Sequence, residues 1–382
     1  MTDTSSPLES ARRLVVKIGS ALLVEESDGS IRYDWLRSLA HDLAELHGQG
    51  REVIVVSSGA IAVGRHYLGL GNGRLKLEEK QAAAATGQLR LAHAYQEVLA
   101  AHDITVSQIL LTLGDTEERR RHLNARNTLN TLLRHRSLPV INENDTIATS
   151  EIRFGDNDRL AARVAAMINA EALVLLSDID GLYSSDPRRD SAAEHIPRIP
   201  RLTAEIEAMA GAAPLGHSSG GMVTKLAAAR VAVGAGCHMA IADGRANSPL
   251  RRLAEGARCS WFLSETEPLA ARKQWIAGAL KPSGVIHIDA GAQTALAAGR
   301  SLLPAGVTAV EGDFERGDAV LVRDPAGQDI ARGLSAYGAL DARRILGHKS
   351  RDIEDILGYR GREEMIHRDD LVLTPLAKGE GK

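Results

Sequence analysis

Residues Ile141–Asp158 read INENDTIATSEIRFGDND, and they follow directly on an apolar run that begins at Leu138. The Asn and Asp residues of this stretch form two clusters, Asn142–Asp145 and Asp156–Asp158. Asn and Asp favour turns because their side chains bond to nearby backbone groups, so either cluster alone would be an ordinary solvated turn. The first cluster, however, lies at the end of a predicted buried strand, and open parallel α/β sheets bind ligands at the carboxyl ends of their strands. We therefore predict that the two clusters hold a small, polar, charged substrate.

The alternation of strand, polar loop and helix recurs over residues 1–265. Helical periodicity begins at Trp35 and again at Lys80, whereas short apolar runs predict strands at Leu14–Val16, Val53–Val56 and Ser107–Leu113. The same succession of strand and polar loop returns at Pro139–Asp145, Leu173–Asp178 and Met239–Asp243. Strands that alternate with helices imply a parallel sheet with right-handed crossovers. The predicted fold class is α/β: a three-layer αβα sandwich with a mainly parallel sheet.

The sequence pattern changes after Cys259. Residues 266–282 predict a linker helix and hinge. The segment 283–361 contains short strand-like runs separated by Gly and Asp, which predicts a small, mostly β domain. Residues 362–382 are expected to form a C-terminal tail, and its last dozen residues, which lose periodicity, are expected to fray.

The composition excludes several classes of protein. With 46 basic and 49 acidic residues among 382, the net charge of −3 gives no reason to expect a polyanionic partner. Cys237 and Cys259 have no CxxC spacing and are expected to be reduced thiols. Neither a targeting segment nor a membrane-spanning run is apparent, so we expect a cytoplasmic location.

Three loops contain glycine beside hydroxyl groups or lysine: Lys17–Ser20 (KIGS), Ser57–Ala60 (SSGA) and Ser218–Lys225 (SSGGMVTK). Each alone would be an ordinary turn. Backbone N–H groups at a helix N-terminus bind anions, and glycine lets a phosphate come close. Together with Lys17, Lys225 and the carboxylate clusters, these loops match phosphoryl transfer, in which catalysis is mostly positioning and charge stabilisation. The sequence contains neither GxxxxGK[ST] nor HExxH, which excludes a Walker-type NTPase and that zinc motif.

Six motifs in order resemble the glutamate 5-kinase family of the amino-acid kinase superfamily. They are KIGS from Lys17, SSGA from Ser57, INEND from Ile141, GDND from Gly155, Ser177-Asp178 with the following Gly181–Tyr183 and Asp186-Pro187, and Gly220–Lys225. Residues 283–361 resemble the PUA domain that bacterial members carry. The sequence departs from the family pattern at two places: Ser20-Ala21 stands where Thr-Ser is common, and Ser177 stands where Thr is common. Both departures are mild, because each keeps a hydroxyl group or a small side chain in place.

The resemblance implies ATP-dependent phosphorylation of the γ-carboxylate of L-glutamate to L-glutamyl 5-phosphate, the first step of proline biosynthesis. By the same resemblance, Lys17 and Lys225 flank the transferring phosphoryl group and Asp158 orients them. Ser58, Asp145 and Asn157 match the glutamate-binding positions. The matching nucleotide-binding positions are Lys17, Ser177, Asp178, Ser219, Gly220, Gly221, Met222, Val223, Thr224 and Lys225. From residue type alone, Asp158 could instead cap the helix that follows it, and Asp145 could stabilise a turn.

The resemblance also implies a cofactor and partners. Mg²⁺ would bridge the nucleotide phosphates without a dedicated cage of protein ligands, so no metal-ligating residue is predicted. Family members are commonly homo-oligomers inhibited by proline, and their product is used by glutamyl phosphate reductase, so the resemblance adds a homo-oligomer, proline and a contact with this reductase to the expected partners.

Two alternative functions stay open. Acetylglutamate, aspartate, carbamate and uridylate kinases belong to the same superfamily, but the PUA-like segment argues against them. PUA domains commonly bind RNA, which makes an RNA-binding protein the alternative from another class. Residues 283–361 contain nine basic and eleven acidic residues, whereas a nucleic-acid site calls for a basic patch, so nucleic acid is not an expected partner.

Overall fold

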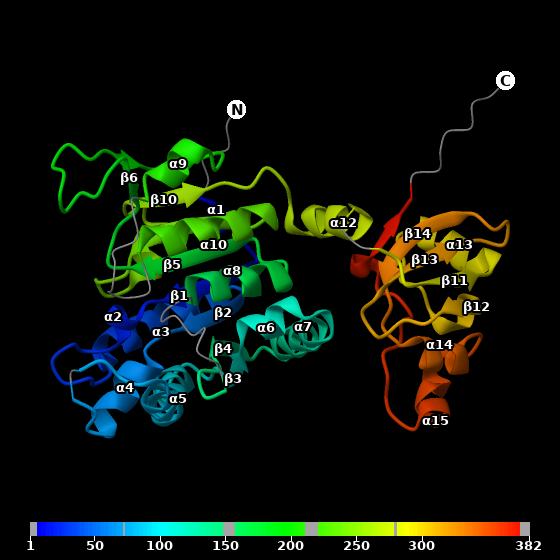
Figure 1. Ribbon diagram of the computed structural model, residues 1–382, viewed down its shortest axis with the longest axis horizontal. Helices are drawn as coiled ribbons and strands as arrows, with labels where there is room; N and C mark the ends of the chain where they lie inside the picture. Colours follow the sequence, from blue (N-terminus) through cyan, green and yellow to red (C-terminus); the bar gives the residue numbers. More distant parts are fainter. Residues whose placement is uncertain (1–5, 72, 148–156, 211–220, 279–280, 375–382) are drawn as a thin grey trace. The chain divides into compact units, whose positions relative to one another are not determined.

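A computed structural model describes residues 6–71, 73–147, 157–210, 221–278 and 281–374 of the chain (Figure 1). By its internal contacts the chain divides into two compact units, Met1–Pro268 and Leu269–Lys382. The first unit ends just beyond the predicted domain limit at residue 265. No helix among the described residues is long and apolar enough to cross a membrane.

The first unit is built on an eight-stranded sheet with the strand order β3-β4-β2-β1-β5-β9-β10-β8. Neighbouring strands are parallel except for the antiparallel pair β9–β10, which confirms the predicted mainly parallel α/β sheet. The strands are β1 (Arg13–Ile18), β2 (Glu52–Ser57), β3 (Val106–Leu111), β4 (Leu138–Glu143), β5 (Ala172–Ser177), β8 (Arg198–Ile199), β9 (His238–Asp243) and β10 (Cys259–Phe262). A separate hairpin pairs β6 (Leu182–Tyr183) with β7 (His195–Ile196).

Helices cover both faces of this sheet because alternate strand residues are apolar on both sides (Figure 1). In β1, Leu14 and Val16 join a core with α3 and α5, whereas Val15 joins a second core with α8 and α10. The helices of this unit are α1 (Pro7–Ser10), α2 (Ser20–Leu23), α3 (Tyr33–Gly48), α4 (Ala60–Tyr67), α5 (Leu77–Ala100), α6 (Leu113–Glu117), α7 (Arg119–Arg134), α8 (Asn157–Met167), α9 (Ala204–Ala208), α10 (Met222–Gly234) and α11 (Pro249–Ala254).

The predicted strand Ser107–Leu113 is wrong at its C-terminal end. Strand β3 stops at Leu111, and Leu113 opens the short helix α6. Thr112 caps this helix: its Oγ1 accepts from the Asp115 backbone N–H, while the Asp115 carboxylate accepts from the Thr112 backbone N–H at 2.7 Å. This reciprocal capping satisfies two otherwise unpaired amides and outweighs the apolar pattern.

Helices α4 and α5 cross at two glycines. A Cβ placed on Gly64 would lie 1.7 Å from the carbonyl oxygen of Ala83, and one on Gly87 would lie 1.8 Å from that of Ala60. Neither position can therefore carry a side chain without moving a backbone. Since α4 begins directly after the loop Ser57–Gly59, this close approach holds α5 against the carboxyl end of β2.

The second unit contains a five-stranded sheet in the order β12-β11-β13-β14-β15, with one parallel pair, β11–β13. This confirms the prediction of a small, mostly β domain. Its elements are α12 (Pro268–Gly278), β11 (Gly284–Ile288), α13 (Ala290–Ala297), β12 (Val307–Gly312), β13 (Ala319–Arg323), β14 (Asp329–Leu334), α14 (Ala339–Ile345), α15 (Ile353–Leu357) and β15 (Leu371–Leu373).

The second unit continues beyond Gly361, where the sequence predicted the start of a tail. Met365 and Ile366 are fully buried, and β15 pairs with β14. Asp370 forms a buried ion pair with Arg272 of α12 at 2.7 Å. The strand was missed because it has only three residues, too few to show a period.

We expect Gly87→Ala to destabilise the chain by about 3 kcal/mol, because overpacking against an unyielding backbone carbonyl costs about that much. Gly234→Ala is the matched control, since it also lies in a helix and a Cβ there meets nothing within 4 Å. Denaturant unfolding of both variants measures the difference. Equal midpoints for the two variants would contradict the tight crossing.

Candidate active site

The carboxyl ends of β1, β2, β4 and β5 meet at one edge of the sheet. Strand β1 lies between β2 and β5, and the chain crosses from one side of β1 to the other between β4 and β5. Such a switch in strand order opens a crevice between the loops that leave the strands. A cleft of about 2260 Å³ lies there, and its lining includes Lys17, Ser58, Asp145, Asn157, Asp178 and Lys225. The structure thus brings together predicted residues from all these loops.

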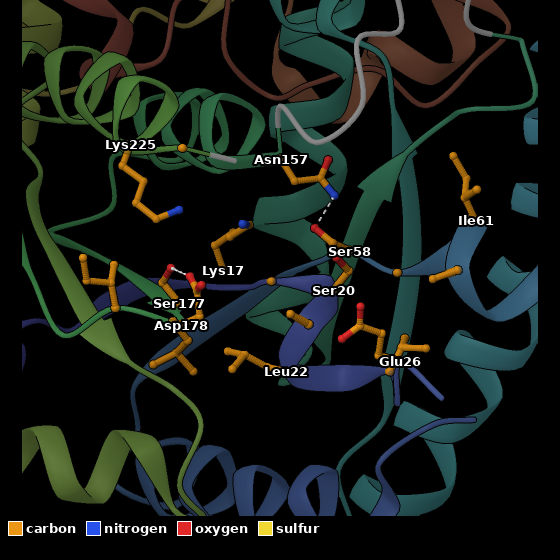
Figure 2. Close-up of a pocket in the computed structure, with 18 of the residues that line it drawn as sticks. Lys17, Ser20, Leu22, Glu26, Ser58, Ile61, Asn157, Ser177, Asp178 and Lys225 are labelled. Atoms are coloured by element: carbon orange, nitrogen blue, oxygen red, sulfur yellow. Dashed lines mark hydrogen bonds between the residues drawn. The ribbon is translucent and has the colours of Figure 1, made fainter. Parts of the chain in front are cut away.

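Two lysines that line this cleft converge on one buried carboxylate, that of Asp158. Figure 2 shows Lys17 and Lys225 with their side chains extending into the cleft. Lys17 Nζ of β1 lies 2.6 Å from Asp158 Oδ1, and Lys225 Nζ of α10 lies 3.1 Å from Asp158 Oδ2. Thr224 Oγ1 also donates to Oδ2 at 3.1 Å. Asp158 is 0% exposed, and the exposed fractions of the lysines are 7% for Lys17 and 5% for Lys225. The cluster is therefore shielded from solvent.

Burial and ion pairing shift the pKa values of this cluster in opposite directions. Burial alone would raise the pKa of Asp158, but the ammonium groups of Lys17 and Lys225 hold that pKa below its ordinary value. Burial lowers the pKa of Lys17, against the attraction of Asp158. Both ammonium groups line the cleft, which suits an anionic ligand.

Asp158 lies in the first turn of α8, where a capping role was the alternative. In the part of the chain that the structure describes, its carboxylate contacts the side chains of Lys17, Thr224 and Lys225, all from other elements. The structure therefore favours Asp158 as a bridge between β1 and α10 over a helix cap.

Asn157 connects the ends of two strands, β2 and β4, on the other side of the cleft. Its Nδ2 donates to the Ser57 carbonyl at 2.8 Å, to Ser58 Oγ at 2.9 Å and to Asn142 Oδ1 at 3.0 Å (Figure 2). Asp145 lies just beyond β4 in the same cleft, where burial raises the pKa of its carboxyl to about 6. This side of the cleft therefore presents amides, a hydroxyl and a carboxylate.

The remaining predicted residues lie at β5 and α10. Ser177 Oγ donates to Asp178 Oδ1 at 3.1 Å, and Arg188 pairs with Asp178 Oδ2 at 2.8 Å. Burial alone would raise the pKa of Asp178, but the bonds from Arg188 and Ser177 outweigh burial and hold that pKa below its ordinary value. Gly221 is the N-cap of α10, whose first turn contains Met222, Val223 and Thr224. Ser219 and Gly220 lie outside the described residues.

Sequence reasoning missed Arg188 and Gln88. Arg188 lies in a polar loop without periodicity, and Gln88 on an Ala-rich helix whose pattern indicates only packing. Gln88 Oε1 accepts from Asn142 Nδ2 at 2.6 Å, although the two residues are 54 positions apart. Only the tertiary fold shows this pairing.

The αβα sandwich has one buried lysine near the end of β1 and a second near the start of α10, and comparisons with known proteins identify its class. A family model described as the amino acid kinase family matches residues 12–243, and a PUA domain model matches residues 284–357. The chain is 63% identical to the glutamate 5-kinase of Paramagnetospirillum magneticum (96% of this chain, 99% of that protein) and 62% identical to that of Rhodospirillum rubrum (94% and 96%). The chain therefore belongs to the glutamate 5-kinases of the amino acid kinase family.

Asp158→Asn should lower the free energy of unfolding by about 3 kcal/mol, because it leaves two buried ammonium groups without their counter-charge. Asp178→Asn is the matched control: its ion pair with Arg188 is about half exposed, and such pairs contribute about 1 kcal/mol or less. Denaturant unfolding at pH 7 compares the two. A loss for Asp158→Asn no larger than that for Asp178→Asn would show that the buried bridge does not stabilise the fold.

Proposed function

We propose that the chain transfers the γ-phosphoryl group of ATP to the γ-carboxylate of L-glutamate, which gives L-glutamyl 5-phosphate, the first step of proline biosynthesis. The observation that carries the proposal is the Lys17–Asp158–Lys225 bridge at the switch point of the sheet. Identities near 60% to glutamate 5-kinases over almost the whole chain support the substrate assignment.

The chemistry requires little beyond positioning and charge. The acceptor carboxylate is already ionised at neutral pH, so no general base is needed. Donor and acceptor are both anions, and Lys17 and Lys225 offset their repulsion from two sides of the transferring group. Asp158 is a positioning residue, since it holds both ammonium groups within ion-pair distance of one carboxylate.

The two sides of the cleft suit the two substrates. Ser58 and Asn157 face glutamate, and the carboxylate of Asp145 attracts its α-ammonium group. This attraction would distinguish free glutamate from its N-acetyl form, which has no charge there. Ser177, Asp178 and the first turn of α10 form the nucleotide side. The family resemblance assigns Ser219 and Gly220 to the same substrate.

Mg²⁺ accompanies ATP in this proposal and supplies positive charge to the phosphates. The donors present fit an ion held mainly by phosphate oxygens and water, because Asp178 is the one carboxylate among the predicted nucleotide-binding residues and is already paired with Arg188. Among the described residues, no three His, Cys, Asp or Glu side chains are grouped as metal ligands.

Other expectations stay predictions. They are inhibition by proline, assembly into a homo-oligomer, contact with glutamyl phosphate reductase and a cytoplasmic location. RNA binding by the PUA unit is the alternative of another class, and the net negative charge of residues 283–361 speaks against it.

The first test is hydroxylamine trapping with ATP and Mg²⁺, with glutamate, N-acetylglutamate and aspartate offered in parallel. An acyl phosphate reacts with hydroxylamine to a coloured hydroxamate, and we expect product from glutamate alone. Hydroxamate from another acid would overturn the substrate assignment. No hydroxamate from any acid would overturn the proposed kinase activity.

The KM for glutamate should depend on the ionisation of Asp145. Because its pKa is raised to about 6, the carboxylate is charged at pH 7.5 and becomes protonated below pH 6. The KM for glutamate should therefore rise about tenfold per pH unit below that value, while the γ-carboxylate of glutamate stays largely ionised.

Asp145→Asn provides the control for this pH dependence. We expect a high KM for glutamate that changes little between pH 5.5 and 7.5, measured at saturating ATP. The same pH profile in the variant and the unmodified chain would assign the titration to another group.

A further inference from the structure

A chain of hydrogen bonds runs from α5 into the cleft. Gln88 Oε1 accepts from Asn142 Nδ2 at 2.6 Å, and Asn142 Oδ1 accepts from Asn157 Nδ2 at 3.0 Å. Asn142 and Asn157 are buried and line the cleft, whereas Gln88 is half-buried and is not among the described residues that line it. Gln88 could therefore influence a ligand only through the two asparagines.

The direction of this chain follows from backbone groups at both ends. The backbone N–H of Glu143 points at Asn142 Oδ1 at 2.8 Å, and an N–H can only donate. The Asn142 oxygen must therefore face Glu143, which turns its NH₂ toward Gln88. At the other end, the Ser57 carbonyl can only accept, so the Asn157 NH₂ must face it at 2.8 Å.

This direction determines what the cleft offers a ligand. Asn157 Nδ2 has two hydrogens and already meets three acceptors, Ser57 O, Ser58 Oγ and Asn142 Oδ1. The nitrogen has no lone pair to accept a bond, so the hydroxyl hydrogen of Ser58 must point elsewhere and is available to a carboxylate. The carbonyl oxygen of Asn157 is left to accept from an ammonium group.

We propose that Gln88 is a positioning residue that fixes the hydrogen-bond polarity of the glutamate pocket through Asn142 and Asn157. The inference rests on the proposed function, since it assumes that Ser58 and Asn157 contact glutamate. Gln88 supplies the acceptor without which the Asn142 NH₂ is a buried donor with no partner in this chain of bonds. Without this acceptor, the Asn142 amide would rotate to find another partner for its NH₂ group. Asn157 would then lose the oxygen that orients its own amide.

The helix crossing explains how a residue on α5 reaches this position. Gln88 directly follows Gly87, whose missing side chain lets α5 approach the backbone of α4. One helical heptad further on, the buried Tyr95 hydroxyl lies 3.0 Å from Ser57 Oγ. The same face of α5 thus contacts the strand ends of both β2 and β4.

The test compares Gln88→Met, which removes the acceptor at similar size, with Gln88→Glu, which keeps an acceptor. We expect Gln88→Met to raise the KM for glutamate about tenfold, the equivalent of about 1.4 kcal/mol, with the KM for ATP changed less than twofold. Gln88→Glu should stay within about threefold of the unmodified chain. Gln96→Met, at an exposed position of the same helix, is the matched control and should change neither constant.

Three results would overturn the proposal. They are an unchanged KM for glutamate in Gln88→Met, a parallel rise in both KM values, or equal effects of Met and Glu. Gln88→Lys, which can only donate and can extend into solvent, repeats the test if Gln88→Met folds poorly. Failure of the unmodified chain to phosphorylate glutamate would instead refute the proposed function.

Discussion

The ion pairs of the buried Asp158 carboxylate with Lys17 and Lys225 are the interaction on which the rest of the first unit depends. The carboxylate joins β1 to α10 through two lysines, so the central strand and a helix far along the chain are held in one arrangement. Removing three charged groups from water costs several kcal/mol per ion, and only close pairing offsets this. Both ammonium groups also line the cleft, so the same constraint that orders the fold places positive charge where an anion can bind.

The sheet supplies the second constraint. Because the strands around β1 are parallel, their carboxyl ends reach one edge, and side chains that follow several different strands meet there. The polar groups there are then ordered by backbone donors and acceptors, as with the Glu143 N–H and the Ser57 carbonyl. Strand register therefore determines the direction of the side-chain hydrogen bonds.

Sequence reasoning predicted the parts of this arrangement that depend on local pattern. The runs at Leu14 and Val53 predict strands because both faces of each strand are apolar, and the loops that follow them predict where ligands bind. The predicted C-terminal end of β3 was wrong because helix capping by Thr112 outweighs the apolar pattern that continues past Leu111. The local sequence does not predict the role of Gln88 or the helix crossing at Gly64 and Gly87. These residues gain their roles only from contacts between elements that are far apart in the sequence.

The two sides of the cleft are held by separate sets of contacts. The lysine bridge depends on α8 and α10, whereas the amide chain depends on α5 and the ends of β2 and β4. They meet at the adjacent residues Asn157 and Asp158, which begin α8 and point to different partners. A change on the α5 side can therefore alter affinity for the small substrate while the charges that surround the phosphoryl group keep their places, because only the start of α8 is common to both.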